Sequence, residues 1–271
     1  MIPKTPSQPP PPPILQTTAS YRFYGHLNDF LPSARRHRCF WHPVKGRPAV
    51  KDTLEALGVP HVEVAHILVS GRSVGFAYQV FPGERVSVYP HFTRLTRRGL
   101  KPLAPADGPR PLKFVADVHL GKLARRLRLW GLDTAYRNDF SDEEIVAVAL
   151  RERRAVLTRD LNLLKHKALR HGHWVRATDT ERQWREVLRR YPRACVGRPF
   201  SRCLVCNGRL VKVNKQAVAN RLPPMTARTY RCFYNCRSCG RIYWKGSHYA
   251  KLRKALFAMR ALRGKRRRKR G

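Results

Sequence analysis

Residues 112–134 read LKFVADVHLGKLARRLRLWGLDT and contain one complete strand–helix unit. The first five residues form a short apolar run that favours a buried strand and ends at Asp117. The apolar residues that follow are spaced 3, 4 and 3 apart: Leu120, Leu123, Leu127 and Trp130. This spacing places them on one face of a helix, which Gly131 ends. The stretch therefore predicts a strand followed by an amphipathic helix.

The same strand–helix order recurs as far as residue 190. Further strands are expected at residues 134–137, 155–158 and 174–176. Further helices are expected at residues 141–150, 161–169 and 180–190. Ser141 and Glu144 have the spacing of a capping box at the start of the first of these helices. Repeated strand–helix units predict a parallel sheet over residues 111–192.

Carboxylates directly follow three of the predicted strands: Asp117, Asp139 and Asp160. The carboxyl ends of parallel strands meet at one sheet edge, which is where open α/β sheets bind ligands. Carboxylates gathered there repel one another and favour a bound Mg²⁺ or Mn²⁺, which makes Asp117, Asp139 and Asp160 the catalytic candidates. Further acids lie on the first turn of the next helix: Asp142, Glu143 and Glu144. The alternative is that these acids serve only as helix caps and turn residues.

Basic side chains surround the predicted acidic site. Those expected to contact phosphate are Lys122, Arg125, Arg126 and Arg159. The first three lie early in the helix after Asp117, where the helix dipole also favours anions. The alternative for each of them is a solvated helix face.

Four cysteines form two C-x-x-C pairs, Cys203 with Cys206 and Cys236 with Cys239. Two such pairs can hold one structural Zn²⁺ through four thiolates. The 29 residues between the pairs exceed the usual spacing and predict an insertion or a long hairpin. The alternatives are a redox dithiol or free thiols, and Cys232 could replace Cys236 as a ligand.

Basic and aromatic residues alternate around the second cysteine pair. The candidates for RNA contact are Arg231, Arg237, Arg241, Tyr243, Trp244 and Lys245. Aromatic rings can stack on bases, while guanidinium and ammonium groups bind phosphates. Residues 198–250 are therefore expected to form a zinc module, a zinc ribbon, that binds nucleic acid, followed by a basic tail at 251–271.

The charge is strongly positive and unevenly distributed along the 271 residues. There are 56 Lys and Arg against 17 Asp and Glu, a formal net charge of +39. Residues 181–271 contain only two acids, whereas nine of the 17 acids lie in residues 111–180. Such a charge predicts a polyanionic partner. No stretch is long and apolar enough for a membrane span or a signal sequence, so a cytoplasmic protein is expected.

The first hundred residues separate into a tail and a small domain. Residues 1–19 are rich in proline, with Pro9 to Pro13 continuous, and are expected to be disordered. Strand runs near residues 21–24, 62–69 and 86–90, with a helix at 50–58, predict a ββαββ-like unit within residues 20–100. Four prolines at residues 102–111 indicate a linker.

Several separated motifs resemble the Mut-seven C-terminal RNase family. They are FVAD (114–117), LGKLAR (120–125), LRLWGLDT (127–134), DEE (142–144), LTRD (157–160) and YWKGSH (243–248). The resemblance implies a PIN-like nuclease followed by a zinc ribbon. It implies a metal-dependent ribonuclease centred on Asp117 and Asp160, with the other acids supporting. It also suggests Asp179, after the fourth strand, as a further acid.

Two N-terminal stretches resemble ubiquitin-like domains of the ThiS and MoaD sulfur-carrier type. They are FYGHLNDFL (23–31) and LGVPHVEV (57–64). The resemblance implies a β-grasp fold. Sulfur carriers need a free C-terminal Gly-Gly, but this domain continues into a linker, so a role in docking a protein partner is expected instead.

Together these features predict a multidomain α/β protein with a β-grasp domain, a PIN-like parallel α/β domain and a zinc ribbon. The function expected is metal-dependent hydrolysis of RNA, with tRNA, rRNA and mRNA as candidate substrates. Two alternatives remain: an RNA- or ribosome-binding protein that retains a nuclease fold without catalysis, and a toxin-like nuclease.

Overall fold

The structure is a computed structural model, which describes the following part of the chain. The described residues are 17–91, 103, 108–192, 194, 198–246, 249–250 and 252–253. Most of the proline-rich tail, the linker and the basic C-terminal tail therefore lies outside the described residues. The chain divides into two compact units, and the division falls within helix α2 (Gly121–Leu129). Residues 125–133 belong with the unit from residue 198 onward, and the rest of the chain forms the first unit.

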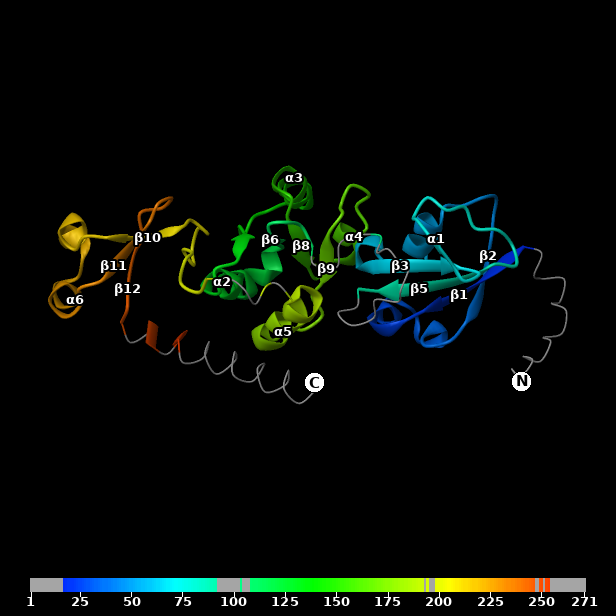
Figure 1. The fold of residues 1–271 in the computed structure, drawn as a ribbon, viewed down its shortest axis with the longest axis horizontal. Helices are drawn as coiled ribbons and strands as arrows, with labels where there is room; N and C mark the ends of the chain where they lie inside the picture. The colour runs from blue at the N-terminus through cyan, green and yellow to red at the C-terminus, as the bar shows by residue number, and fades with distance from the viewer. Residues whose placement is uncertain are drawn as a thin grey trace, which may run out of the picture. The chain divides into compact units, whose positions relative to one another are not determined.

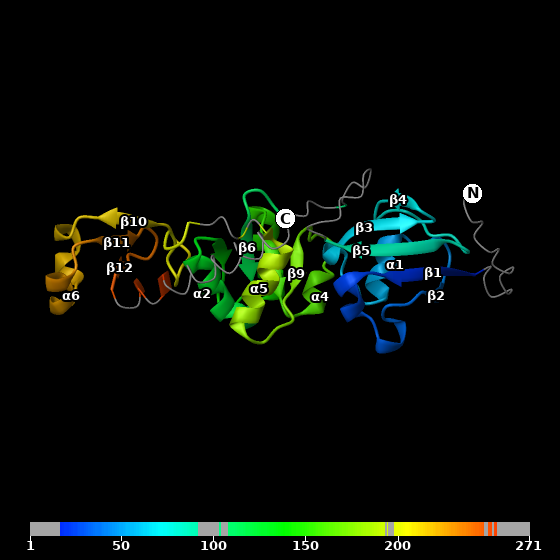
Figure 2. The ribbon, with the colours of Figure 1, turned by 60° about the horizontal axis from the view of Figure 1, so that its bottom comes forward.

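The N-terminal part of the first unit contains a five-stranded sheet. Its strands are β1 (Thr18–Phe23), β2 (Phe40–Pro43), β3 (Val64–Val69), β4 (Arg72–Val74) and β5 (Arg85–Pro90), in the order β2-β1-β5-β3-β4. The central pair, β1 and β5, is parallel, whereas the pairs at the two edges are antiparallel. Helix α1 (Val50–Ala56) packs against the sheet through Val50 and Leu54, which belong to the same buried core as the strands (Figure 2).

This arrangement confirms the predicted ubiquitin-like β-grasp fold. The predicted strand at residues 62–69 is shorter, because residues 61–63 form a 3₁₀ turn before β3. Two of the five strands were not located by the prediction: β2, and β4, which follows β3 after a tight turn at Gly71. Gly71 has a φ of +86°, which explains why a glycine occupies this position.

The second part of the first unit contains the predicted parallel sheet. Its strands are β6 (Lys113–Ala116), β7 (Asp133–Ala135), β8 (Ala155–Thr158) and β9 (Gly172–Trp174), in the order β7-β6-β8-β9. The pairs β6–β8 and β8–β9 are parallel. Helices α3 (Asp142–Glu152) and α5 (Thr180–Arg190) lie on opposite sides of this sheet (Figure 1). The prediction of a central parallel α/β domain is confirmed.

Three predicted elements of this domain have different bounds in the structure. A 3₁₀ turn at Val118–Leu120 precedes α2, so the helix begins at Gly121. The helix predicted at residues 161–169 is the short α4 (Leu161–Leu164), after which the chain turns and Leu169 returns to the core. The strand predicted at residues 174–176 is β9, which ends at Trp174. For α4 and β9, burial in the core determines where the apolar residues lie, and helical or strand spacing does not.

The second unit contains a three-stranded antiparallel sheet. Its strands are β10 (Leu210–Val213), β11 (Phe233–Cys236) and β12 (Ile242–Trp244). A 3₁₀ helix (Gln216–Arg221) and helix α6 (Pro224–Thr229) fill the long connection between β10 and β11. Val218 of the 3₁₀ helix and Leu222, which directly follows it, form a small core with Phe233. The unusual spacing between the cysteine pairs is therefore an insertion that folds back on the sheet.

No helix within the described residues is long and apolar enough to cross a membrane.

Two half-buried histidines predict that the first unit loses stability in acid. Burial, together with the charge of Arg190, lowers the pKa of His91 to about 3 and that of His171 to about 4. The unfolded chain binds protons at these rings near pH 6.5, so it binds more protons than the folded chain between these values. Stability therefore falls as the pH drops from about 6.5 toward 4. We expect a lower urea midpoint at pH 5 than at pH 7, and a smaller difference in a His91→Gln variant. Equal midpoints at the two pH values would contradict this expectation.

Candidate functional site

Asp117 and Asp160 follow neighbouring parallel strands, and one side chain links them. Asp117 comes directly after β6 and is 5% exposed, whereas Asp160 lies two residues after β8 and is exposed. The Thr158 hydroxyl donates a hydrogen bond to Asp117 Oδ2 over 2.7 Å. The same hydroxyl accepts one from the backbone N–H of Asp160 over 2.8 Å. The two acids are therefore held at one edge of the sheet by a shared hydroxyl group.

Thr158 lies in the LTRD motif (157–160), but its neighbours in the sequence do not indicate its role. It is the last residue of β8, is fully buried, and has a polar side chain in a strand that is otherwise apolar. A buried hydroxyl needs hydrogen-bond partners, so a lone threonine at the end of a buried strand was a usable signal.

Removing the Thr158 hydroxyl is expected to destabilise the first unit. A Thr158→Val variant keeps the shape but leaves Asp117 Oδ2 without this donor and the Asp160 N–H without its acceptor. We expect a loss of about 1–3 kcal/mol in the free energy of unfolding, measured by urea denaturation. Thr158→Ser keeps the hydroxyl and should retain most of that stability. Equal losses in both variants would show that the methyl group, and not the hydroxyl, matters.

Asp142 is electrostatically coupled to the other two acids. Its pKa is raised by partial burial and by the nearby charges of Asp160 and Asp117, with Glu143 adding a smaller effect. Since like charges raise a carboxyl pKa when they lie close together, these three carboxylates are near enough to interact, although their oxygens do not all lie within 4.8 Å of one another. The sequence analysis named Asp142 only as an additional acid.

The remaining predicted acids have other partners in the structure. Asp139 accepts a hydrogen bond from Arg137 Nε over 2.9 Å, and this guanidinium lowers the pKa of Asp139. Glu144 also pairs with Arg137 and completes the predicted capping box with Ser141. Glu143 is exposed on the same turn. Asp179 caps helix α5 by accepting from the Arg182 N–H. Metal binding by these four acids stays a prediction.

The predicted phosphate contacts lie on α2 and in the loop after β8. Lys122, Arg125 and Arg126 lie on α2, where Lys122 and Arg125 are exposed and Arg126 is half-buried. Arg159 is exposed between Thr158 and Asp160, and its carbonyl accepts from the indole N–H of Trp174 over 3.2 Å. The side chains of Lys122, Arg125 and Arg159 are available to solvent, as phosphate binding would require.

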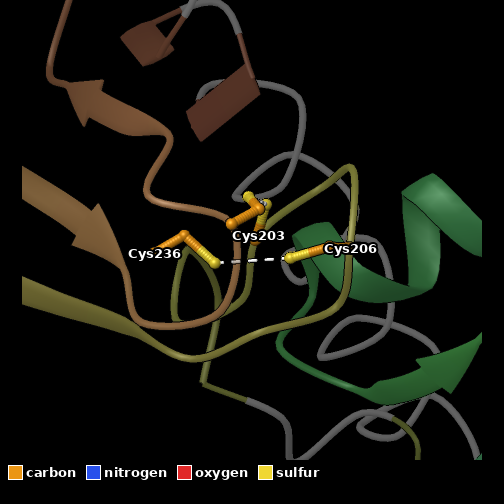
Figure 3. Close-up of side chains that lie close together, drawn as sticks. Cys203, Cys206 and Cys236 are labelled. Atoms are coloured by element: carbon orange, nitrogen blue, oxygen red, sulfur yellow. Dashed lines mark hydrogen bonds between the residues drawn. The ribbon is translucent and has the colours of Figure 1, made fainter.

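The four predicted zinc ligands converge. Cys203 and Cys206 precede β10, and Cys236 and Cys239 lie at the end of β11 and just beyond it. Figure 3 shows the sulfurs of Cys206 and Cys236 pointing toward each other, 3.4 Å apart, and Cys203 Sγ lies 3.7 Å from Cys239 Sγ. Among the described residues this is the one set of three or more His, Cys, Asp or Glu side chains whose ligand atoms all lie within 4.8 Å of one another. Cys232 is exposed and outside the set, so the alternative that it replaces Cys236 is wrong.

The sulfur positions fit a zinc ion. Tetrahedral Zn–S bonds of about 2.3 Å place neighbouring sulfurs about 3.8 Å apart, close to the separations seen here. Burial acts to raise the pKa of Cys203, but the Tyr243 hydroxyl and nearby backbone groups lower it to about 6. Burial and the neighbouring sulfurs raise the pKa of Cys206 to about 12. Four crowded sulfurs cannot all become thiolates without a cation between them, so the cluster could hold zinc.

Two side chains support the first cysteine pair from outside. Tyr243 Oη lies 3.1 Å from Cys203 Sγ and accepts the backbone N–H of Leu204 over 3.1 Å. Arg128, from the second half of α2, is 2% exposed and donates to the carbonyls of Leu204 and Val205 over 3.1 and 2.7 Å. The turn that carries Cys203 and Cys206 is therefore fixed to α2 within the second unit.

The predicted RNA-contacting residues of the second unit divide by type. The charged ones are exposed: Arg231, Arg237, Arg241 and Lys245. The aromatic ones are engaged within the unit, since Tyr243 contacts Cys203 and Trp244 packs on the core around Phe233. The exposed charges could bind phosphates. Base stacking on Tyr243 would require one face of its ring to be accessible while its hydroxyl keeps the contacts with Cys203 and Leu204.

Comparisons with known proteins agree with the fold and with these motifs. A family model described as "Mut7-C RNAse domain" matches residues 112–256, more than half of the chain, and one described as "Mut7-C ubiquitin" matches residues 16–96. No curated protein matches. Among solved structures, the crystal structure of H. volcanii small archaeal modifier protein 1 is 17% identical, with a TM-score of 0.22, over 27% of this chain and 97% of that one. The two family matches confirm both resemblances, and the chain belongs to the Mut7-C RNAse domain family, with a Mut7-C ubiquitin domain ahead of the RNAse domain.

Proposed function

We propose that this protein is a metal-dependent ribonuclease of the PIN-like type, using Mg²⁺ or Mn²⁺. The observation that supports this most directly is the pair of acids joined by the Thr158 hydroxyl, with Asp142 close enough to sense both charges. A fold can carry many functions, so the proposal rests on this site and on the RNAse-domain match together.

The acids suit a hard divalent cation. Carboxylate oxygens are its preferred ligands, and Mg²⁺ commonly binds one or two carboxylates while keeping several waters. Asp117 and Asp160 would hold the ion, with Asp142 beside them. A bound ion of this kind lowers the pKa of a coordinated water and stabilises charge on a phosphodiester.

The chain's own groups position the reactants. The Thr158 hydroxyl fixes the Asp117 carboxylate, and the Asn162 N–H donates to Asp160 Oδ1 over 2.8 Å. The exposed side chains of Lys122 and Arg159 would hold the RNA backbone near the acids.

RNA binding is proposed to rest on charge spread over the chain. The excess of 39 positive charges exceeds what a single active site needs, and it includes the exposed arginines of the second unit.

We propose a cytoplasmic setting, because reducing conditions keep cysteine thiols available for zinc. The ubiquitin-like domain is proposed to contact a protein partner as well.

The test is cleavage of labelled linear and circular RNAs by purified protein with Mn²⁺, with Mg²⁺, and with EDTA. We expect cleavage that requires the divalent ion. A cut circular RNA would show an endonuclease, and cleavage confined to linear RNA an exonuclease. RNAs left intact under all metal conditions would overturn the proposal.

The second candidate is a non-catalytic RNA-binding protein, which the large net charge favours. It predicts tight RNA binding whose logarithm falls steeply with the logarithm of salt concentration, without metal-dependent cleavage.

A further inference from the structure

A buried carboxylate joins the ubiquitin-like domain to the nuclease domain within the first unit. The side chain of Glu63 is fully buried in the 3₁₀ turn before β3. It accepts the backbone N–H of Trp174 over 2.6 Å and lies 3.0 Å from His173 Nδ1, while His26 Nε2 is 3.3 Å away. Burial acts to raise the pKa of Glu63, but His173 and His26 outweigh it and hold the pKa well below its ordinary value. Glu63 is thus an ionised group whose main partners lie on β9.

The neighbours of Glu63 continue this junction. Val62 belongs to the hydrophobic core of the nuclease domain, together with residues such as Val115 and Leu164. His61 Nε2 lies 2.7 Å from the Leu169 carbonyl oxygen. Apolar packing and buried hydrogen bonds together indicate a fixed junction rather than a tethered pair of domains.

Trp174 connects this junction to the residue before Asp160. Its backbone N–H is bound by Glu63, and its indole N–H donates to the carbonyl of Arg159 over 3.2 Å. Its ring contacts Phe30 of the ubiquitin-like domain at a centroid distance of 5.0 Å. The Arg176 guanidinium lies 4.6 Å from the same ring and also pairs with Asp29 over 3.1 Å. Two elements of the ubiquitin-like domain therefore fix both the backbone and the ring of Trp174.

The strand register brings the same residue beside the catalytic candidates. Trp174 is the partner of Thr158 in the β8–β9 pairing, and the Val175 N–H donates to the Thr158 carbonyl over 2.8 Å. The backbone of Thr158 and that of Arg159 are thus both bound by residues 174–175, and Asp160 follows at once.

We propose that the ubiquitin-like domain is a built-in positioning element for the nuclease site, with Glu63 and Trp174 as positioning residues that hold the Thr158–Asp160 segment in place. The effect of this positioning on catalysis rests on the proposed nuclease function. The positioning of residues 158–160 itself does not depend on that function. The ubiquitin-like domain acts on the nuclease domain of the same chain through the two hydrogen bonds of Trp174, to Glu63 and to the Arg159 carbonyl. It should therefore influence the position of Asp160 without contacting the substrate.

The structural part is tested by amide hydrogen exchange on the full chain. Trp174→Phe keeps the ring against Phe30 but removes the indole N–H, and Glu63→Gln weakens the bond to the Trp174 N–H. We expect exchange within residues 159–162 to become about tenfold faster in Trp174→Phe, as the loss of one hydrogen bond implies, and at least as fast in Glu63→Gln. Trp41→Phe is the matched control, because Trp41 is 52% exposed on β2, and it should leave this exchange unchanged. Exchange in β1 and β5 shows whether each variant is folded.

The catalytic part is tested by cleavage kinetics of the same variants. We expect kcat to fall about tenfold in Trp174→Phe with KM unchanged, because in this proposal Trp174 acts only through the carbonyl of Arg159. If wild-type protein does not cleave RNA, the proposed function fails, but the exchange result still decides the positioning role. Unchanged exchange at residues 159–162 in Trp174→Phe overturns the inference, and so does a folded Glu63→Gln variant that matches wild type in both measurements.

Discussion

Replacing Asp117 by asparagine is expected to lower Mn²⁺-dependent RNA cleavage at least about a thousandfold. The substitution removes one of the two carboxylates proposed to hold the ion while keeping the size of the side chain. Losing one electrostatic contact to a transition state commonly costs a hundredfold to a thousandfold, and loss of a metal ligand adds to this. The measurement is the single-turnover rate on a labelled RNA at saturating protein. Asp160→Asn should show a similar loss.

Asp139→Asn is the matched control for this experiment. Asp139 also follows a strand of the same sheet, but its side chain is 69% exposed and pairs with Arg137. If Asp117 and Asp160 hold the ion as proposed, Asp139 contributes only its surface ion pair with Arg137, so we expect the cleavage rate of Asp139→Asn to stay within about threefold of wild type. Equal losses for Asp117→Asn and Asp139→Asn would show that the two acids act alike, and equal activity of Asp117→Asn and wild type would place the site elsewhere.

Replacing Cys236 by serine is expected to abolish zinc binding and unfold the second unit. Structural zinc in small modules supplies about 10–16 kcal/mol of apparent binding free energy, which is folding free energy for such modules. Zinc content, measured by mass spectrometry, should fall from one ion per chain to none. Because Arg128 is bound to the carbonyls of Leu204 and Val205, the second half of α2 should also lose its protection from hydrogen exchange.

Cys232→Ser provides the control for the zinc experiment. Cys232 is exposed and outside the four-sulfur cluster, so its replacement should leave both the zinc content and the exchange of residues 125–133 unchanged. Retention of zinc by Cys236→Ser would contradict the assignment of the four ligands. Loss of zinc with α2 still protected would show that Arg128 does not depend on the cysteine turn.

The features that could be predicted from the sequence are those that depend on contacts between residues close together in the chain. The capping box of Ser141 and Glu144 is present as predicted, because both of its hydrogen bonds lie within one turn. The apolar strand before Asp117 and the two C-x-x-C pairs also depend on short spacings. These patterns were sufficient for the order of elements and for the four cysteines.

What the sequence analysis missed depends on long-range contacts. Thr158 contacts Asp117 across 41 residues, and Glu63 contacts His173 across 110. The hydroxyl of Tyr243 contacts Cys203, 40 residues earlier, a contact that the sequence analysis did not predict. Leu169 was assigned to a helix by its spacing, although burial in the core determines its place. In each case the partner is fixed by the fold and not by neighbouring residues.

The pairing of Arg128 with Val205 also sets an order for folding during synthesis. The two residues are 77 positions apart, so Arg128 leaves the ribosome well before its acceptors do. At about 5–20 residues per second, translation takes roughly 4–15 s to cover that distance. Until then, two of the carbonyls that bind Arg128 in the folded chain, those of Leu204 and Val205, have not yet been synthesised. We expect this part of α2 to become stable late, when the nascent chain has reached the cysteine turn, and chaperones that bind exposed apolar helices have that interval in which to act.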